Sequence, residues 1–124
     1  MFQKHFTPQE ATQTLPLVRK IVSDLLEKGR TLRGLEEANP DEETSSKVQK
    51  LKEEMIELTK ELEALGCYYK DWNFEYGLVD FPAIINGQEA LLCWRSDEED
   101  IQFYHGIDEG YAGRKTIPES HFVG

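Results

Sequence analysis

The sequence predicts an α+β fold, in which a long, coiled-coil-like antiparallel helical hairpin precedes a small antiparallel β-meander. Through most of the first half, apolar residues recur at alternating intervals of three and four. In the second half, apolar segments flank Asn86-Gly87, a dipeptide typical of two-residue hairpin turns. The length of 124 residues fits one domain, with the hairpin in residues 1–66, the meander in 67–118 and a tail in 119–124.

The first helix is predicted to begin at Thr7-Pro8-Gln9-Glu10, where Thr7 and Glu10 can bond each other's backbone amides. The apolar seam that follows has heptad spacing. It consists of Ala11, Leu15, Val18, Val22, Leu25, Gly29 and Leu32. Pro16 lies inside this seam and lacks the amide hydrogen that a helix interior requires. Either the helix kinks at Pro16, or a short first turn ends and Thr14 caps the main helix.

The second helix is predicted to begin at Asn39-Pro40-Asp41-Glu42, which repeats the cap pattern, or one turn later at Ser45-Ser46. Gly66 is suited to end it in a left-handed conformation. The apolar seam between these ends consists of Val48, Leu51, Met55, Leu58, Leu62 and Leu65. Two helices of similar length with a short polar connection predict an antiparallel pair.

The hairpin carries more apolar surface than the seam between two helices can bury. Leu17, Ile21 and Leu26 lie beside the first seam, and Ile56 lies beside the second. This wider stripe must face the C-terminal sheet or a second subunit. We expect a homodimer in which two hairpins form a four-helix bundle, and coverage by the sheet alone is the alternative.

The second half predicts three full strands, at Leu78–Ile85, Gln88–Arg95 and Ile101–His105. Before them, residues 67–72 are expected to be extended, so the meander has three or four strands. Pro82 cannot donate a ladder hydrogen bond, so it favours a sheet edge or a bulge.

The segment after the third strand is expected to be a glycine-shaped loop. Glycines at positions 106, 110 and 113 indicate positive φ angles or a close approach of the backbone to another group. From Pro118 onward, the tail is expected to fray or to lie over a neighbour.

Composition argues against several classes of function. The net charge is −10, and both halves are acidic, so we expect no binding to nucleic acid or to an anionic membrane. No apolar run suits a signal peptide or a membrane span, and a cytoplasmic protein is expected. Cys67 and Cys93 are far apart in the chain. With His105 they have no metal-ligand spacing, so we expect no metal and no cofactor.

Several motifs occur together along most of the chain. They are FTxxEA from Phe6, LGxxxKD from Leu65, GLVDFP from Gly77, LCWR from Leu92 and EGxAGR from Glu109. From Phe6 to about Pro118 the chain therefore resembles an uncharacterised prokaryotic family, the domain-of-unknown-function family 2203. The resemblance implies no activity, substrate or partner. It implies that Asp80, Trp94, Arg95, His105, Gly110 and Arg114 belong to the pattern of that family.

The chain also departs from that pattern. Gly106 follows His105 where an acidic residue is expected, and Tyr104 replaces a tryptophan. The connection from Asp71 to Gly77 is slightly longer. If the family uses an acid directly after the histidine, this chain has moved or lost it.

Six residues are candidates for ligand binding, and no catalytic residue is assigned. They are Asp80, Trp94, Arg95, His105, Glu109 and Arg114. His105 is either a general base or anion donor, or a structural imidazole that ties a strand end to a carboxylate such as Asp80. Asp80 is either solvated or directed into a pocket.

Arg114 and Trp94 also allow two interpretations each. Arg114 can clamp a carboxylate or phosphate of a ligand, or close a salt bridge to Glu109 or Asp108. Trp94 fits core or interface packing better than a stacking platform. Cys93 is expected on the opposite face from Trp94, as a buried and inert thiol.

Two hypotheses of function follow. The first is a homodimeric binding or regulatory module that pairs through the helical hairpin and presents its acidic half to a protein or a small molecule. The second is an enzyme or ligand-binding protein for a small anionic metabolite. There His105 would serve as acid or base, Asp80 would orient it and Arg114 would hold the anion. The site could lie within one chain or across a dimer.

Overall fold

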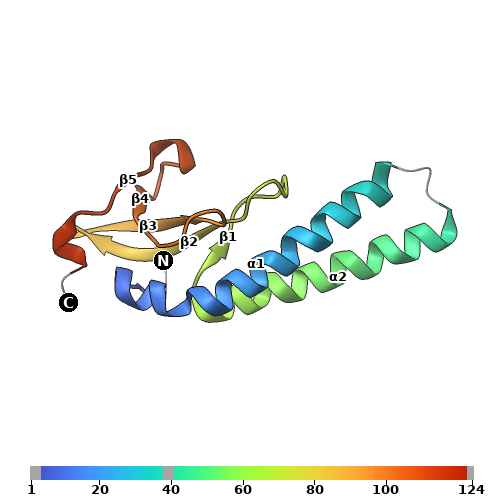
Figure 1. Ribbon diagram of the computed structural model, residues 1–124, viewed down its shortest axis with the longest axis horizontal. Coiled ribbons are helices and arrows are strands. Elements are labelled where there is room, and N and C mark those ends of the chain that lie inside the picture. Colours follow the sequence, from blue (N-terminus) through green and yellow to red (C-terminus); the bar gives the residue numbers. More distant parts are fainter. Residues whose placement is uncertain (1–3, 38–40, 123–124) are drawn as a thin grey trace.

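A computed structural model describes residues 4–37 and 41–122 and shows two long helices followed by a five-stranded antiparallel sheet (Figure 1). The helices are α1 (Pro8–Glu37) and α2 (Glu42–Leu65). The strands are β1 (Tyr68–Tyr69), β2 (Leu78–Ile85), β3 (Gln88–Arg95), β4 (Phe103–Gly106) and β5 (Lys115–Thr116), in spatial order β1-β2-β3-β4-β5. Short 3₁₀ turns occupy Tyr111–Gly113 and Glu119–His121. The predicted α+β class is confirmed.

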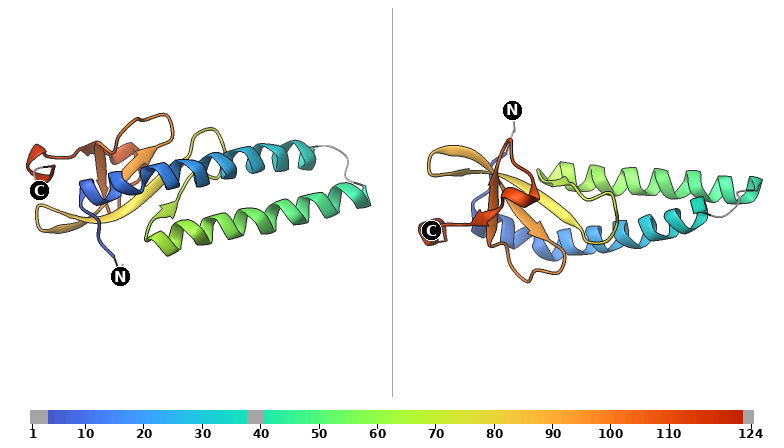
Figure 2. Two further views of the ribbon diagram at one scale, coloured as in Figure 1. Left: turned by 60° about the horizontal axis from the view of Figure 1, so that its bottom comes forward. Right: turned by 90° about the horizontal axis from the view of Figure 1, so that it is seen from above.

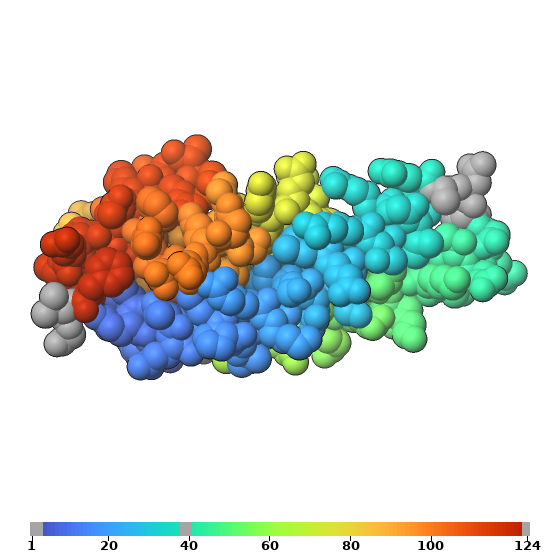
Figure 3. All heavy atoms as spheres, in the orientation of Figure 1, coloured from blue at the N-terminus to red at the C-terminus, as the bar shows by residue number. Residues whose placement is uncertain are grey.

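The sheet lies against only one half of the hairpin. This is the half that contains the start of α1 and the end of α2, and the other half projects beyond the sheet (Figures 1 and 2). In the space-filling view, this end of the hairpin continues from the body of the molecule without the sheet beside it (Figure 3). Neither α1 nor α2, as far as the structure describes them, is apolar enough over a sufficient length to cross a membrane.

The start of α1 has the predicted capping box. The amide of Thr7 donates to Oε1 of Glu10 at 3.0 Å, and the amide of Glu10 donates to Oγ1 of Thr7 at 3.1 Å. The helix then continues through Pro16 to its end. The alternative in which Thr14 caps a separate main helix is therefore wrong. The Thr14 hydroxyl instead donates to the carbonyl of Ala11 at 2.6 Å.

The ends of α2 also follow from local chemistry. Asp41 is the N-cap, and its carboxylate accepts a hydrogen bond from the amide of Thr44 at 2.7 Å. Of the two predicted starts, the earlier one is confirmed, although Asn39 and Pro40 themselves lie outside the described residues. Gly66 ends the helix with φ of 101°, as predicted.

The core lies between the hairpin and the inner face of the sheet. Pairing of β2 with β3 sets Val79 opposite Trp94 and Phe81 opposite Leu92, and all four side chains are buried. From α1 the core receives Ala11, Leu15, Val18, Ile21, Val22 and Leu25. Burial of these side chains supplies most of the free energy that holds the sheet on the hairpin.

Part of the predicted surplus stripe is covered within one chain. Ile21 is buried in the core, and Leu26 packs against it. In contrast, Leu17 and Ile56 are each 52% exposed. The folded chain therefore accounts for half of the stripe that was expected to face a second subunit.

The Asn86-Gly87 turn joins β2 and β3 as predicted. Asn86 has φ of 52° and Gly87 has φ of 79°, the pair of positive angles that a type I′ turn requires. Ile85 then pairs with Gln88, and both strands have their predicted bounds. The third strand is shorter than predicted. The extended segment expected at residues 67–72 forms the two-residue strand β1, and β5, which was not predicted, raises the total to five.

Pro82 lies where β2 has a free edge. Strand β1 pairs only with Val79 and Asp80, so it ends before Pro82. The carbonyl of Pro82 accepts a hydrogen bond from the amide of Phe6 at 2.6 Å. Since the nitrogen and carbonyl of one strand residue point to the same side, the missing amide hydrogen also faces this edge. The expectation of an edge position is met at this point of the strand, without a bulge.

The glycines of α1 provide a matched test of the packing. A Cβ added at Gly29 would lie 2.2 Å from the Phe74 ring, whereas one at Gly34 would have no atom within 4 Å. We expect Gly29→Ala to lower the free energy of unfolding by about 1–3 kcal/mol, because Phe74 must move. Gly34→Ala should raise it by up to about 1 kcal/mol through helix propensity. Urea denaturation measures both, and an unchanged or increased stability of Gly29→Ala would contradict the packing described.

Candidate functional site

The outer face of the sheet, opposite the helices, carries three adjacent side chains that can take part in chemistry. Side chains alternate along a strand, so Asp80 points outward between the inward Val79 and Phe81. The register places Cys93 directly opposite Asp80, and His105 opposite Leu91. His105 is thus one diagonal step from Cys93. Although they face away from the core, Asp80, Cys93 and His105 are only 4%, 0% and 3% exposed.

His105 forms hydrogen bonds through both ring nitrogens. Nδ1 lies 2.9 Å from the carbonyl oxygen of Gly106, which can only accept, so Nδ1 carries a hydrogen. Nε2 lies 3.1 Å from Oδ1 of Asp80. These bonds, first that with Asp80 and then one with Cys93, raise the pKa of His105 to about 10. The predicted tie between a strand-end imidazole and Asp80 is confirmed, and the raised pKa favours the protonated form of His105.

A cavity of about 340 Å³ opens beside this pair. Its lining consists of Lys70, Leu78, Asp80, Leu91, Cys93, His105, Ile107, Glu109, Gly110 and Tyr111. Residues 107–111 come from the loop after β4, so this loop forms one wall and the sheet forms the other. Six of the lining residues are charged or titratable, and Leu78, Leu91 and Ile107 supply apolar surface. This combination is typical of a small-molecule site.

Glu109 holds the loop in place. Its Oε1 accepts a hydrogen bond from the amide of Gly106 at 2.8 Å and lies 3.5 Å from Nζ of Lys115. The amide bond first, and then Lys115, lower the pKa of Glu109. A Cβ at Gly106 or Gly113 would lie 3.0 Å from atoms of Glu109. The close approach predicted for the loop glycines is confirmed at these two positions, but none of the loop glycines has a positive φ.

Arg114 lies outside the cavity lining. Its guanidinium pairs with the carboxylate of Glu98, and it stacks over the rings of Phe103 at 3.9 Å and Tyr111 at 4.8 Å. Arg114 therefore bonds neither Asp108 nor Glu109, the partners considered from the sequence. The structure does not bring it to Asp80 and His105.

Arg95 is also engaged in structural contacts. It forms a bidentate pair with Asp97 at 2.5 and 2.7 Å, which lowers the pKa of Asp97. Its other terminal nitrogen donates to the Tyr111 hydroxyl at 2.7 Å. Arg95 thereby fastens the 3₁₀ turn of the loop to the sheet.

Trp94 lies on the inner face, where it is 1% exposed, so the core interpretation is confirmed. Its indole nitrogen donates to the carbonyl of Glu98 at 2.9 Å. The carboxylate of Glu98 accepts from the amide of Arg95 at 2.8 Å in addition to pairing with Arg114. Sequence reasoning missed this role of Glu98, because Arg114 reaches it only through the path of the chain after β4.

Cys93 was expected to be buried and inert, and its place beside Asp80 was missed. The signal for it was available in the sequence. Counting back from Asn86-Gly87 pairs Ile85 with Gln88, and seven further steps pair Leu78 with Arg95, which sets Asp80 opposite Cys93. Lys70 and Tyr111 gave no comparable signal, because a loop and a two-residue strand bring them to the cavity.

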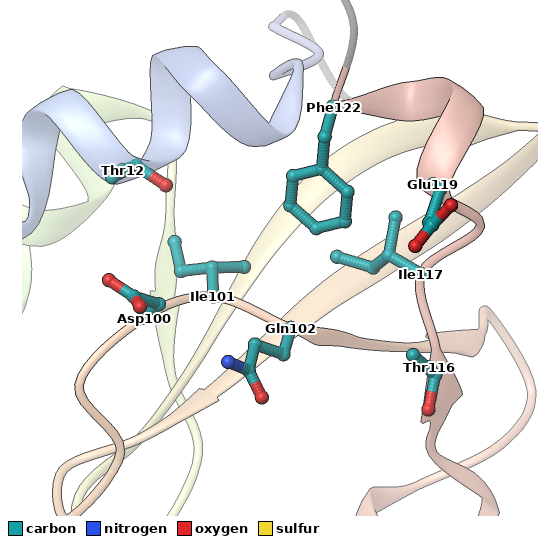
Figure 4. A pocket seen from close by; sticks show the side chains of 8 residues that line it. All are labelled: Thr12, Asp100, Ile101, Gln102, Thr116, Ile117, Glu119 and Phe122. Atoms are coloured by element: carbon teal, nitrogen blue, oxygen red, sulfur yellow. The ribbon is translucent and has the colours of Figure 1, made fainter.

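A larger cavity, of about 640 Å³, lies between the start of α1 and the C-terminal tail. The side chains of Ile101, Ile117 and Phe122 point into it, and Asp100 and Glu119 lie at its margin (Figure 4). Among the described residues that line it, none is a histidine, a cysteine or a base. This cavity can accept apolar groups, but it has no set of residues suited to acid–base chemistry.

Because Asp80 and His105 are buried together, we expect their contributions to stability to be coupled. His105→Gln or Asp80→Asn alone should lower the free energy of unfolding by about 3 kcal/mol, because one charged partner stays buried without the other. The double variant should cost less than the sum of the two. Asp24→Asn, which breaks the exposed pair with Lys20, should cost at most about 1 kcal/mol. Denaturant titration in metal-free buffer measures all four, and strict additivity would contradict the pairing.

Comparison with known proteins gives a family but no activity. A search of curated proteins found no match, and a search of solved structures found none. A scan of protein families matched residues 4–117 to the uncharacterised conserved proteins of DUF2203. This match covers both helices, all five strands and every residue of the cavity described above. The chain therefore belongs to the DUF2203 family of uncharacterised conserved proteins.

Proposed function

We propose that the protein is a cytoplasmic interaction module that forms a homodimer through its helical hairpin. The observation that carries this proposal is an apolar groove on the hairpin, at whose rim Ile56 and Trp72 are 52% and 53% exposed. Large apolar side chains that stay half in water beside a groove favour an interaction surface.

The groove holds about 390 Å³ and joins three segments of the chain. Its lining consists of Leu32 from α1, of Lys52, Met55, Ile56 and Thr59 from α2, and of Trp72 and Phe74 from the connection to β2. The Trp72 ring is held edge-on by Tyr69 at 4.9 Å and Phe74 at 6.1 Å. A positioned tryptophan of this kind is a frequent anchor in protein interfaces.

A second copy of the chain is the partner that suits this groove best. The groove lies on paired helices whose far half projects beyond the sheet (Figure 3). A twofold axis can place Ile56 of each hairpin against the groove of the other, so that one patch serves both partners. Two antiparallel hairpins paired in this way form a four-helix bundle, which would cover Ile56 of the surplus apolar stripe but not Leu17.

We expect Ile56→Glu to shift the dimer to a monomer at micromolar concentration, because a charge would be buried in the groove. Leu17→Glu is the matched control, since Leu17 is also a helix residue with 52% exposure and lies outside the groove. Light scattering coupled to size exclusion gives the mass of each variant. A monodisperse wild-type monomer without concentration dependence would overturn the proposed dimer.

The second candidate function is binding or conversion of a small anionic metabolite in the cavity of the outer face. The specific observation in its favour is that the His105 imidazolium and Asp80 lie on the cavity wall. Lys70 lines the same cavity, whereas Arg114 is engaged with Glu98. On this hypothesis Lys70 and His105 contact the anion, and Arg114 acts by holding Tyr111 and the loop.

A thermal-shift screen of small carboxylates and phosphates tests this second function. A ligand that stabilises the wild type should lose at least tenfold in affinity in Lys70→Ala, because the cavity loses a cation. Lys20→Ala, which removes an exposed lysine of α1, should leave the affinity unchanged. Equal shifts in wild type, Lys70→Ala and His105→Gln would rule out binding in this cavity.

A further inference from the structure

We propose that Asp80, Cys93 and His105 form a binding site for a transition-metal ion, and that zinc is the ion that suits this set of donors best. The inference concerns the same cavity as the second candidate function, but it rests on a separate observation, the geometry of three donor atoms. It also holds whether or not the hairpin forms a dimer.

The three donor atoms lie close enough to share one ion. One atom each from the Asp80 carboxylate, the Cys93 thiol and the His105 ring all lie within 4.8 Å of one another. Tetrahedral zinc with bonds of about 2.0–2.3 Å needs donor atoms that are roughly 3.3–3.7 Å apart. The largest separation therefore exceeds the tetrahedral value by at most roughly 1 Å, which side-chain movement on metal binding would have to close. Among the residues that the structure describes, Asp80, Cys93 and His105 are the group of acidic, cysteine and histidine side chains whose donor atoms lie this close together.

The hydrogen bonding of His105 suits a metal ligand. Its Nδ1 hydrogen is held by the carbonyl of Gly106 at 2.9 Å, which fixes the ring and directs Nε2 toward Asp80. In metal-bound histidines, the ring nitrogen that does not bind the metal commonly donates its hydrogen to a backbone carbonyl. An ion would take the place of the proton between Nε2 and Asp80, and it would displace the proton of the Cys93 thiol.

Burial makes this set of polar donors unusual for the outer face of a sheet. Asp80 and His105 are almost fully buried beside the apolar Leu91 and Pro82, which raises the cost of keeping both charges out of water. A thiolate, an imidazole and a carboxylate are together the donors of zinc sites with three protein ligands. A divalent ion bound by a thiolate and a carboxylate would keep the buried site neutral overall, and it would replace the proton between His105 and Asp80.

The cavity leaves room for a fourth ligand. Its lining includes all three donors, and the opposite wall contains Ile107 and Tyr111. Glu109 also lines the cavity, but its carboxylate is occupied by the amide of Gly106 and by Lys115. Three protein donors with one open position are typical of zinc sites that bind water or a substrate. The geometry thus points to a site for a reactive or exchangeable ligand rather than to a closed structural site.

Cobalt titration of tag-free protein, stripped of metal with a chelator, tests the proposal. We expect one Co²⁺ per chain, with the visible bands of a tetrahedral site and a near-ultraviolet sulfur-to-cobalt band. Zn²⁺ should displace the cobalt, bind with a Kd below about 1 μM and raise the Tm. Cys93→Ser should abolish the sulfur-to-cobalt band and lower the affinity at least 100-fold. Asp80→Asn should lower the affinity 10- to 100-fold and keep the band.

Cys67→Ser is the matched control. Cys67 is equally buried, but its thiol donates to the Leu62 carbonyl at 3.4 Å and lies in the core. It should keep the full affinity and the cobalt spectrum. Circular dichroism confirms that each variant is folded. If Cys93→Ser does not fold, the affinity of Asp80→Asn decides the outcome.

Two results would overturn the metal site. One is a wild-type titration without the sulfur-to-cobalt band, and the other is equal affinity in the wild type, Cys93→Ser and Asp80→Asn. Either result, combined with an intact anion-induced thermal shift, would reject the metal and keep the ligand-binding function. Metal binding as expected, without any anion-induced thermal shift, would keep the metal site and reject the anion-binding function.

Discussion

The register of the β2–β3 hairpin is the constraint on which both the core and the candidate site depend. Positive φ at Asn86 and Gly87 forms a two-residue turn, and that turn sets every pair from Ile85–Gln88 to Leu78–Arg95. A slip of one residue would exchange the two faces of a strand. Val79 and Phe81 would leave the core, and Asp80 would enter it. One local turn therefore secures apolar packing on one face and brings Asp80 to Cys93 on the other.

Charged side chains hold the loop over the outer face. Glu98 connects Arg114, the amide of Arg95 and the indole of Trp94, and Arg95 reaches the hydroxyl of Tyr111. The acidic turn between β3 and β4 thus serves as a set of anchors as well as a solvated connection. Because these bonds engage both arginines, the charged side chains that line the cavity are those of Lys70, Glu109 and the paired Asp80 and His105.

The hairpin groove and the outer-face cavity are joined by one segment. Lys70 and Leu78 line the cavity, and between them in the chain Trp72 and Phe74 line the groove. Phe74 is held against Gly29, where α1 has no Cβ to exclude its ring. The connection from β1 to β2 therefore borders both surfaces, although the two differ in chemistry. The groove is apolar, and the cavity contains a buried ion pair.

The sequence by itself determined the start of α1, the end of α2, the helical seams, the β2 and β3 strands and their turn, and the family. These features depend on backbone conformation and on hydrogen bonds between near neighbours, as at Thr7–Glu10 and Asp41–Thr44. The predicted proximity of His105 to Asp80 followed from the antiparallel order of the strands that carry them. Only the tertiary structure decided that Glu98 pairs with Arg114, that Ile21 is buried within one chain and that Lys70 reaches the cavity. These contacts depend on the path of loops and on which helix face meets the sheet, and neither is encoded in local spacing.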